Sequence, residues 1–392
     1  MRVAARGHTR PSRLVHGSCR AVPGTDWHVP CTIRSYSVRR LIPSDPTVRT
    51  DPAAKPRRRP FRAVLRTAGV AFVAVAVLAA LAVGGCFRSK DALAGVPVER
   101  QLRIGTADGR QRTAVLVVPT GDAPPEGWPL VVMLHGAGGS TRNVLDATHW
   151  DTLAEREGFV VVFPNGTPVD EAKPERFVGN PQTWNSGAGT SLAAGDRSAE
   201  AKGIDDVAFL AQLIDRVRGR TAIDGRRIYL AGHSNGAGMA FRFASERPEL
   251  LAAVGVMAGH LAEGLRDLRS PVSLIAISGD RDPFAPLEGG EAGTPRVKMQ
   301  TRPVRLNSSD WARANGLPDD PKTARDDEAL LVRQWGPNEA GTEVRWIVVR
   351  NHGHAWAGGS DSLPESIIGP GSTALDATRE MWEFFKAHPK PR

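Results

Sequence analysis

The chain has 392 residues, of which 41% are hydrophobic and 24% charged, a composition that excludes a disordered chain, a collagen and a coiled coil. The formal net charge of +9 is divided unevenly: residues 1–86 hold 15 Lys and Arg against 3 Asp and Glu, whereas the remainder holds 36 against 39. The larger part therefore has no polycationic surface, and we expect no nucleic-acid partner.

The cysteines repeat this division, since Cys19, Cys31 and Cys86 all fall within the first 86 residues. We expect neither a disulfide nor a thiolate metal site in the rest of the chain, and we predict no metal and no cofactor.

An uncharged apolar run, residues 68–85, follows a stretch rich in arginine. A basic flank and an apolar run that ends in small residues are typical of an export signal. The run leads into Cys86 through Val-Gly-Gly, which resembles a bacterial lipobox and makes Cys86 a predicted lipidation site. The pair Arg58 and Arg59 also resembles a twin-arginine signal.

Three fates of this leader remain open: a lipoprotein, an uncleaved membrane helix, since about 20 apolar residues span a bilayer, or plain secretion. In each case we expect an exported protein, in the cell envelope or extracellular. We assign residues 57–86 to the signal or anchor, 87–95 to a linker and 96–392 to one globular domain. Residues 1–56 are predicted to be a disordered basic extension or an overextended gene start.

Strand-like and helix-like runs alternate along the globular domain. Runs rich in β-branched residues and apolar on both faces predict strands buried in a mostly parallel sheet with helices on both faces, an α/β fold. Asp108 and Gly109 predict a hairpin between the first two strands. The predicted strands are residues 98–104, 112–119, 129–134, 159–163, 226–231, 272–278 and 344–349, and the predicted helices are 205–218, 235–246 and 375–387.

Two long segments, residues 167–202 and 288–328, are rich in Gly, Pro, Asp and Ser and receive no assignment. In open α/β sheets, such stretches lie over the carboxyl ends of the strands, where ligands bind. We therefore expect these two segments to build most of the ligand pocket.

A candidate nucleophile stands in the sequence Gly-His-Ser-Asn-Gly around Ser234, which has the pattern G-x-S-x-G. The pattern directly follows a predicted buried strand and opens a predicted helix, as a sharp strand-to-helix turn with an exposed serine requires. The alternative is a glycine-rich turn in which Ser234 only caps the helix.

A serine hydroxyl needs a base and an orienting carboxylate, which in this kind of sheet follow in the order Ser, Asp, His. The ends of two later predicted strands offer candidates in that order. Asp280 and Asp282 follow the first of these strands, and His352 and His354 follow the second.

An oxyanion hole needs two backbone N–H groups aimed at one point. The amide of Asn235, next to the serine, is one predicted donor, and the amide of Ala137, in the glycine-rich segment after strand 129–134, is the other. His135 is interpreted as a hydrogen-bond partner that stabilises this loop, and His233 as a packing residue.

With these features, the chain resembles the esterase family of polyhydroxybutyrate depolymerases and feruloyl esterases, which includes exported lipoprotein esterases and belongs to the α/β-hydrolase superfamily. The resemblance covers residues 98–388 and implies the α/β-hydrolase fold. It depends on six blocks in family order: LHGAGGS at Leu134, TWNSG at Thr183, IDDVAFL at Ile204, IDGRRIYLAGHSNGAGMA at Ile223, SGDRDPFAP at Ser278 and HGHAWAGG at His352.

The resemblance selects Asp282 as the acid and His354 as the base, leaving Asp280 and His352 outside the site. It implies a two-step acyl transfer in which Ser234 attacks an ester carbonyl and water then hydrolyses the acyl-enzyme, without a metal or cofactor.

The resemblance also suggests substrate-binding residues. Trp184 matches a family element near the pocket mouth and could stack on an aryl or sugar group, although a packed loop tryptophan is the alternative. Trp356 is the second predicted substrate-binding residue. Asp205 and Asp206 match a family pair that we interpret as capping the following helix. Ala137 replaces a cysteine frequent in depolymerases, which favours a feruloyl or acetyl esterase.

The sequence thus predicts an exported serine carboxylic ester hydrolase of the feruloyl, acetyl or short-chain type, acting on a small or polymer-linked ester. Three alternatives stay open: a polyester depolymerase, a serine peptidase of the same fold, and a non-catalytic protein that binds an envelope ligand. The sequence does not predict the acyl group, the alcohol or the oligomeric state.

Overall fold

A central sheet organises the computed structural model, which describes residues 101–189, 197–262, 268–293, 298–360 and 363–391. Within these residues the sheet contains ten strands in the order β1-β2-β4-β3-β7-β8-β9-β14-β13-β12. Their bounds are β1 Gln101–Gly105, β2 Gln111–Val117, β3 Trp128–Leu134, β4 Val160–Pro164, β7 Ile223–His233, β8 Ala253–Met257, β9 Ser273–Gly279, β12 Lys322–Asp326, β13 Leu330–Trp335 and β14 Val344–Val349. The predicted leader, linker and lipidation site at Cys86 lie outside the described residues, and the start of the globular domain at residue 96 stays a prediction.

The six strands from β4 to β14 in the sheet order are parallel, whereas β1, β2, β12 and β13 pair antiparallel at the two edges. Side chains of the parallel strands alternate between two apolar cores. In β3, for example, Leu130 and Val132 enter one core and Val131 and Met133 the other. Burial on both faces explains the continuous apolar runs in the sequence.

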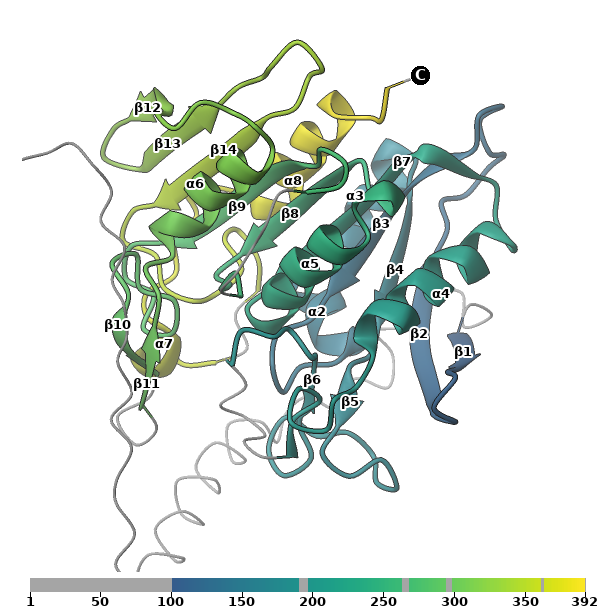
Figure 1. Ribbon diagram of the computed structural model, residues 1–392. Coiled ribbons are helices and arrows are strands. Elements are labelled where there is room, and N and C mark those ends of the chain that lie inside the picture. Colours follow the sequence, from purple (N-terminus) through teal and green to yellow (C-terminus); the bar gives the residue numbers. More distant parts are fainter. Residues whose placement is uncertain (1–100, 190–196, 263–267, 294–297, 361–362, 392) are drawn as a thin grey trace, which may run out of the picture. The chain divides into compact units, whose positions relative to one another are not determined.

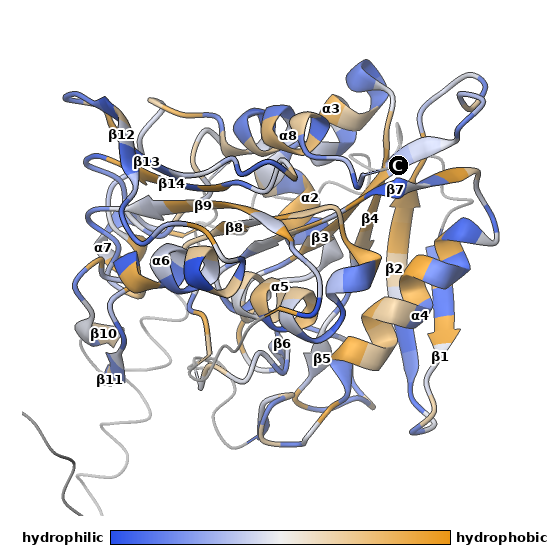
Figure 2. Ribbon diagram, turned by 45° about the horizontal axis from the view of Figure 1, so that its top comes forward, coloured by the Kyte–Doolittle hydropathy of each residue, from blue (hydrophilic) through white to orange (hydrophobic). Residues whose placement is uncertain are grey.

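Helices cover both faces of the sheet, as Figure 2 shows in a view along it. Helices α4, α5 and α6 supply side chains to the first core, and α2, α3 and α8 supply the second. The mostly parallel sheet covered on both faces confirms the predicted α/β-hydrolase architecture. The helix bounds are α2 Thr141–Thr148, α3 Trp150–Glu157, α4 Asp206–Arg218, α5 Asn235–Glu246, η3 Pro248–Leu250, α6 Arg305–Ala314, α7 Glu365–Ile368 and α8 Ala377–Ala387.

The predicted strands and helices are confirmed within a few residues, except that residues 98–100 are not described. The hairpin at Asp108 and Gly109 is also confirmed, because β1 and β2 pair antiparallel across it and Gly109 has φ 82°. Strand β8 was missed, since Gly255 interrupts its apolar run. That glycine is needed because a Cβ there would lie 2.8 Å from the sulfur of Met381 in α8.

The two segments that received no assignment, residues 167–202 and 288–328, lie only partly where they were predicted, over the ends of the strands. Figure 1 places both small hairpins beyond the end of the sheet, β10–β11 beside α7 and β5–β6 below α2 and α4. However, α6 packs on the sheet through the buried Trp311, and β12 forms the sheet edge. Every residue of β12 is exposed, so no apolar pattern marks it in the sequence. The bounds are β5 Thr167–Pro168, β6 Gln182–Thr183, β10 Gly290–Gly293 and β11 Lys298–Thr301.

Two searches of the described residues gave negative results. None of their helices is long and apolar enough to cross a membrane. None of their His, Cys, Asp and Glu side chains gather in threes or more as potential metal ligands.

Candidate active site

Ser234 lies at the turn that joins β7 to α5, the position predicted for an exposed nucleophile. Its backbone has φ 54° and ψ −120°, a combination that costs free energy for a residue with a side chain. Glycines flank it because the backbones approach closely: a Cβ at Gly232 would collide with the carbonyl of Gly236, and a Cβ at Gly236 with the carbonyl of His135. The local sequence thus forces the serine above the end of the sheet.

The structure brings Ser234, His354 and Asp282 into one chain of hydrogen bonds. The Oγ of Ser234 lies 2.8 Å from Nε2 of His354, and Nδ1 of His354 lies 2.8 and 2.9 Å from the two carboxylate oxygens of Asp282. With the proton on Nδ1, the imidazole donates to Asp282 and accepts from the serine hydroxyl, the tautomer that a general base requires.

Asp282 is buried, and its Oδ1 accepts hydrogen bonds from the amides of Phe284 and Ala285. Burial raises the pKa of this carboxyl, but the charge and hydrogen bond of His354 and the two amides outweigh it, so the pKa lies below its usual value. Asp282 therefore remains an anion beside the imidazole.

The loop that carries His354 is fixed through its backbone. His233 donates from Nε2 to the carbonyl of His354 over 2.7 Å, and the amide of His354 donates to the carbonyl of Ile368 over 2.6 Å. Desolvation of its buried ring lowers the pKa of His233 to about 4, which keeps the ring neutral. His233 thus supports the base through this hydrogen bond, in addition to the packing predicted for it.

The second carboxylate and second imidazole lie outside this chain of hydrogen bonds, as predicted. Asp280 accepts at Oδ1 from the amide of His352 over 3.3 Å. His352 is buried; its Nε2 donates to the carbonyl of Ala355, and its Nδ1 accepts from the amide of Ser372. Both side chains hold the loop together.

The two predicted oxyanion donors both adjoin Ser234. Asn235 is the first residue of α5, and Ala137 lines the same pocket as the serine. Within the described part of the chain, neither backbone amide donates to a protein acceptor. Both amides are thus available to a ligand at the amino end of a helix.

His135 stabilises the loop of Ala137 through hydrogen bonds, as predicted. Its Nδ1 donates to the carbonyl of Gly136, and its Nε2 accepts from the amide of Gly166 over 2.9 Å. Burial lowers its pKa to about 4, so the ring is neutral.

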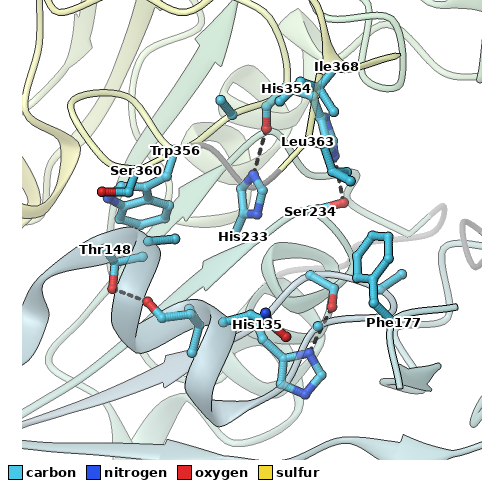
Figure 3. A pocket seen from close by; sticks show the side chains of 17 residues that line it. His135, Thr148, Phe177, His233, Ser234, His354, Trp356, Ser360, Leu363 and Ile368 are labelled. Atoms are coloured by element: carbon cyan, nitrogen blue, oxygen red, sulfur yellow. Dashed lines mark hydrogen bonds between the residues drawn. The ribbon is translucent and has the colours of Figure 1, made fainter. Parts of the chain in front are cut away.

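A pocket of about 140 Å³ opens beside Ser234. Figure 3 shows Trp356, Thr148 and Ser360 on one side of it and Phe177 on another. Trp356 lines it as predicted, but the prediction that the two unassigned segments build most of the pocket was wrong. The walls come mainly from the loop after β3, α2 and the loop after β14, and only Phe177 comes from residues 167–202.

Four apolar wall residues of the pocket were not predicted from the sequence: Val144, Phe177, Leu363 and Ile368. For Phe177 the sequence did contain a signal, since a large apolar side chain stands in a polar loop. In the structure this side chain is 45% exposed. Val144 and Ile368 belong to short helices and look like ordinary core residues in the sequence, and Leu363 precedes the second of these helices.

The prediction that Trp184 binds substrate was wrong. Trp184 is fully buried, does not line the pocket, and donates from its indole Nε1 to the carbonyl of His135 over 2.9 Å. The packed alternative is therefore the correct one, because no substrate can reach the ring.

The capping prediction for the two neighbouring aspartates holds for one of them. Asp205 caps α4 by accepting from the amide of Ala208. Asp206 is instead fully buried and forms an ion pair with Arg112 at 2.8 Å. Its other oxygen accepts from the amide of Asn185 over 2.8 Å.

Comparisons with known proteins place this arrangement among esterases. A family model described as Esterase PHB depolymerase matches residues 113–288. A protein of Nocardia uniformis subsp. tsuyamanensis named as an esterase, NocK, is 25% identical over 281 residues, which are 68% of this chain and 76% of that protein.

Two further relatives come from fungi. The bifunctional acetylxylan esterase/xylanase XynS20E of Neocallimastix patriciarum is 24% identical over 63% of this chain and 31% of its own length. Feruloyl esterase C of Emericella nidulans is 28% identical over 46% of this chain and 58% of its own length. The chain thus spans less than two thirds of either fungal protein.

A parallel sheet with a serine at its strained turn, together with esterases as relatives, defines the class as the serine carboxylic ester hydrolases with the α/β-hydrolase fold. Within this class, the chain is similar to the esterase family of polyhydroxybutyrate depolymerases and feruloyl esterases, whose model matches residues 113–288 and whose relatives include proteins named esterase and feruloyl esterase. This is the family that the six sequence blocks predicted.

Proposed function

We propose that this protein is an exported esterase that removes short acyl groups from esters of an apolar or aromatic alcohol, through an acyl-enzyme on Ser234. The observation that carries the proposal is the continuous chain of hydrogen bonds from Asp282 through His354 to a serine held in a strained conformation. Such a chain activates a hydroxyl for attack on a carbonyl carbon.

In the first half-reaction, the Oγ of Ser234 attacks the ester carbonyl while its proton passes to Nε2 of His354. The negative oxygen of the tetrahedral intermediate accepts from the amides of Ala137 and Asn235, and Asp282 stabilises the imidazolium. His354 then donates the proton to the departing alkoxide. In the second half-reaction, water repeats the attack on the acyl-enzyme and restores the serine.

The size of the pocket supports a short acyl group. Pockets that enclose drug-sized ligands measure about 300–1,000 Å³, whereas this one measures about 140 Å³. Its wall residues Val144, Ala147 and Ile368 are apolar, so the enclosed group is apolar too.

The rim supports an apolar or aromatic body on the remainder of the ester. The large hydrophobic side chains that stand exposed on the described surface are Phe177, Val178 and Ile367. Phe177 lines the pocket, and Ile367 adjoins the pocket residue Ile368. The exposed aromatic ring of Phe177 at the pocket wall offers an apolar surface on which an apolar or aromatic group can pack. The name of one relative, a bifunctional acetylxylan esterase/xylanase, agrees with a short acyl group.

Export is proposed on the sequence alone. The apolar run at residues 68–85 and the cysteine at position 86 support a lipoprotein that faces esters of the cell envelope or the medium.

A panel of esters tests this function. The purified full-length protein, solubilised in detergent, is assayed on 4-nitrophenyl esters from acetate to decanoate, methyl ferulate, a hydroxybutyrate oligomer and a peptide 4-nitroanilide, with Ser234→Ala as the control. We expect the largest kcat/KM for acetate to butyrate and none above control for the anilide. Activity absent on all esters, or equal in Ser234→Ala, would contradict the proposal.

A further inference from the structure

The two proposed oxyanion donors come from different elements, and their spacing must be held. The amide of Ala137 belongs to the loop after β3, whereas the amide of Asn235 belongs to the turn after β7. An oxyanion hole works only when both donors lie about 2.7–3.1 Å from the developing negative charge. One short segment, residues 182–186, touches both donor elements, and we call it the brace.

On one side, the brace binds the loop that carries Ala137. The indole Nε1 of Trp184 donates to the carbonyl of His135 over 2.9 Å, and the carbonyl of Gln182 accepts from the amide of Gly138 over 2.7 Å. The loop is therefore attached to the brace on both sides of Ala137.

On the other side, the brace binds the side chain of Asn235. Its Oδ1 accepts from the backbone amide of Trp184 over 2.7 Å, and its Nδ2 lies 3.2 Å from the carbonyl of Trp184 and 3.3 Å from the Oγ of Ser186. Asn235 is buried, so these hydrogen bonds form away from bulk solvent.

The brace is itself fixed from behind by charge. The amide of Asn185 donates to Asp206, whose carboxylate pairs with Arg112. The guanidinium of Arg112 lies 4.0 Å from the ring centroid of Phe209, which stacks on Trp184 at 6.5 Å between centroids. A buried ion pair and stacked rings leave the tryptophan little freedom to move.

We propose that Trp184 is a positioning residue that holds the amides of Ala137 and Asn235 at the spacing that the tetrahedral oxygen requires. The inference rests on the proposed function, since it concerns the same reaction. Trp184 touches no substrate, so it acts on the transition state alone and leaves ground-state binding unchanged.

The test compares Trp184→Phe with a matched variant, Trp311→Phe. Both tryptophans are fully buried, and each indole donates to a backbone carbonyl at 2.9 Å, but Trp311 does so to Val272, away from the pocket. The full-length protein is assayed on 4-nitrophenyl acetate and inhibited with a phenylboronic acid, which forms a tetrahedral adduct with an active-site serine. Thermal unfolding is measured in parallel.

For Trp184→Phe we expect kcat to fall about tenfold, KM to stay within about twofold, and the boronate Ki to rise by the same factor as kcat falls. Trp311→Phe should lower the unfolding temperature similarly and leave kcat and Ki within about twofold. Unchanged kcat and Ki in folded Trp184→Phe, or equal losses in both variants, would overturn the inference.

A second variant serves if Trp184→Phe does not fold. Asn235→Asp keeps the shape and the backbone amide but removes the Nδ2 donor facing the brace, so it should show the same loss of kcat at constant KM. Wild-type values of kcat and KM in Asn235→Asp would overturn the proposal that the brace positions the oxyanion donors. A wild-type protein without esterase activity would instead overturn the proposed function, and that result appears before any variant is compared.

Discussion

Ser234 is approached from two sides that differ in their contact with water. On the acid–base side, from the ends of β9 and β14, the imidazole of His354 is partly exposed although Asp282 is buried. On the oxyanion side, Ala137 is half-buried where it lines the pocket, but the residues behind it are closed to water: Trp184 is fully buried and Asn235 is 2% exposed. The serine itself is half-buried between them.

This difference follows from the chemistry assigned to each side. A base that exchanges protons with an entering water and a leaving alcohol needs access to solvent. Fixed dipoles stabilise an oxyanion best where water is excluded and where they need not reorganise. Variants on the acid–base side should therefore change rate more than stability, and variants behind the brace should change stability strongly.

The largest effect is expected at the base. His354→Ala should lower kcat about 10⁴- to 10⁶-fold with little change in unfolding temperature, because it removes the ring nitrogen that lies 2.8 Å from the serine Oγ and accepts its proton. His352→Gln, two residues away, is the control, and its kcat should stay within about tenfold. Initial rates and thermal unfolding measure both. A larger loss in His352→Gln would reverse the assignment.

Asp282→Asn should follow with a loss of about 10³- to 10⁴-fold in kcat, since the amide favours the wrong imidazole tautomer. The matched substitution Asp280→Asn removes a carboxylate of the same loop that accepts a hydrogen bond from the amide of His352 and not from His354. Its kcat should change less than about fivefold. Equal losses in steady-state assays of the two variants would show that the carboxylate acts through the loop and not through His354.

Behind the brace, Asp206→Asn should destabilise the fold by about 3–5 kcal/mol, because it leaves the charge of Arg112 buried and unpaired. The control is Asp224→Asn, which breaks a partly exposed pair with Arg227 and should cost less than about 1 kcal/mol. Urea unfolding measures both. If Asp206→Asn lowered the free energy of unfolding no more than Asp224→Asn does, the oxyanion side would not be the more rigid of the two sides.

The effect that is most gradual concerns pH. His135 and His233 have pKa values of about 4 in the fold, below the ordinary 6.5, because burial disfavours their charged forms. Between pH 4 and pH 6.5 the unfolded chain binds more protons than the folded chain. The free energy of unfolding is therefore highest above about pH 6.5 and falls as the pH drops toward 4, by up to about 1.4 kcal/mol per pH unit for each histidine. Urea unfolding from pH 7 to pH 4.5 should show this slope, and His135→Gln should reduce it. An equal slope in His135→Gln would contradict the assignment.

Strand ends predicted Ser234 together with two candidate carboxylates and two candidate imidazoles, because parallel strands end at a common edge. The family resemblance then selected Asp282 and His354, the pair that the structure connects to the serine. Trp184 could not be placed in this way, since an indole in a loop serves equally to pack or to stack. The pocket walls also escaped prediction, because Phe177 and Ile368 meet only through loop conformations that no periodicity encodes.

The same limit applies to the edge of the sheet. Strand β14 is apolar because it is covered on both faces, whereas β12 is exposed along its whole length and its pairing with β13 leaves no pattern. Sequence periodicity records burial, so elements without burial are invisible to it.

Labelling with a fluorophosphonate tests the central claim most directly. The full-length protein and its His354→Ala variant are incubated with the probe, and mass spectrometry locates the adduct. We expect one adduct on Ser234 in the wild type, formed at least about a hundredfold more slowly in His354→Ala. An adduct on another residue, equal labelling of both proteins, or no adduct on folded protein would contradict an activated serine at position 234.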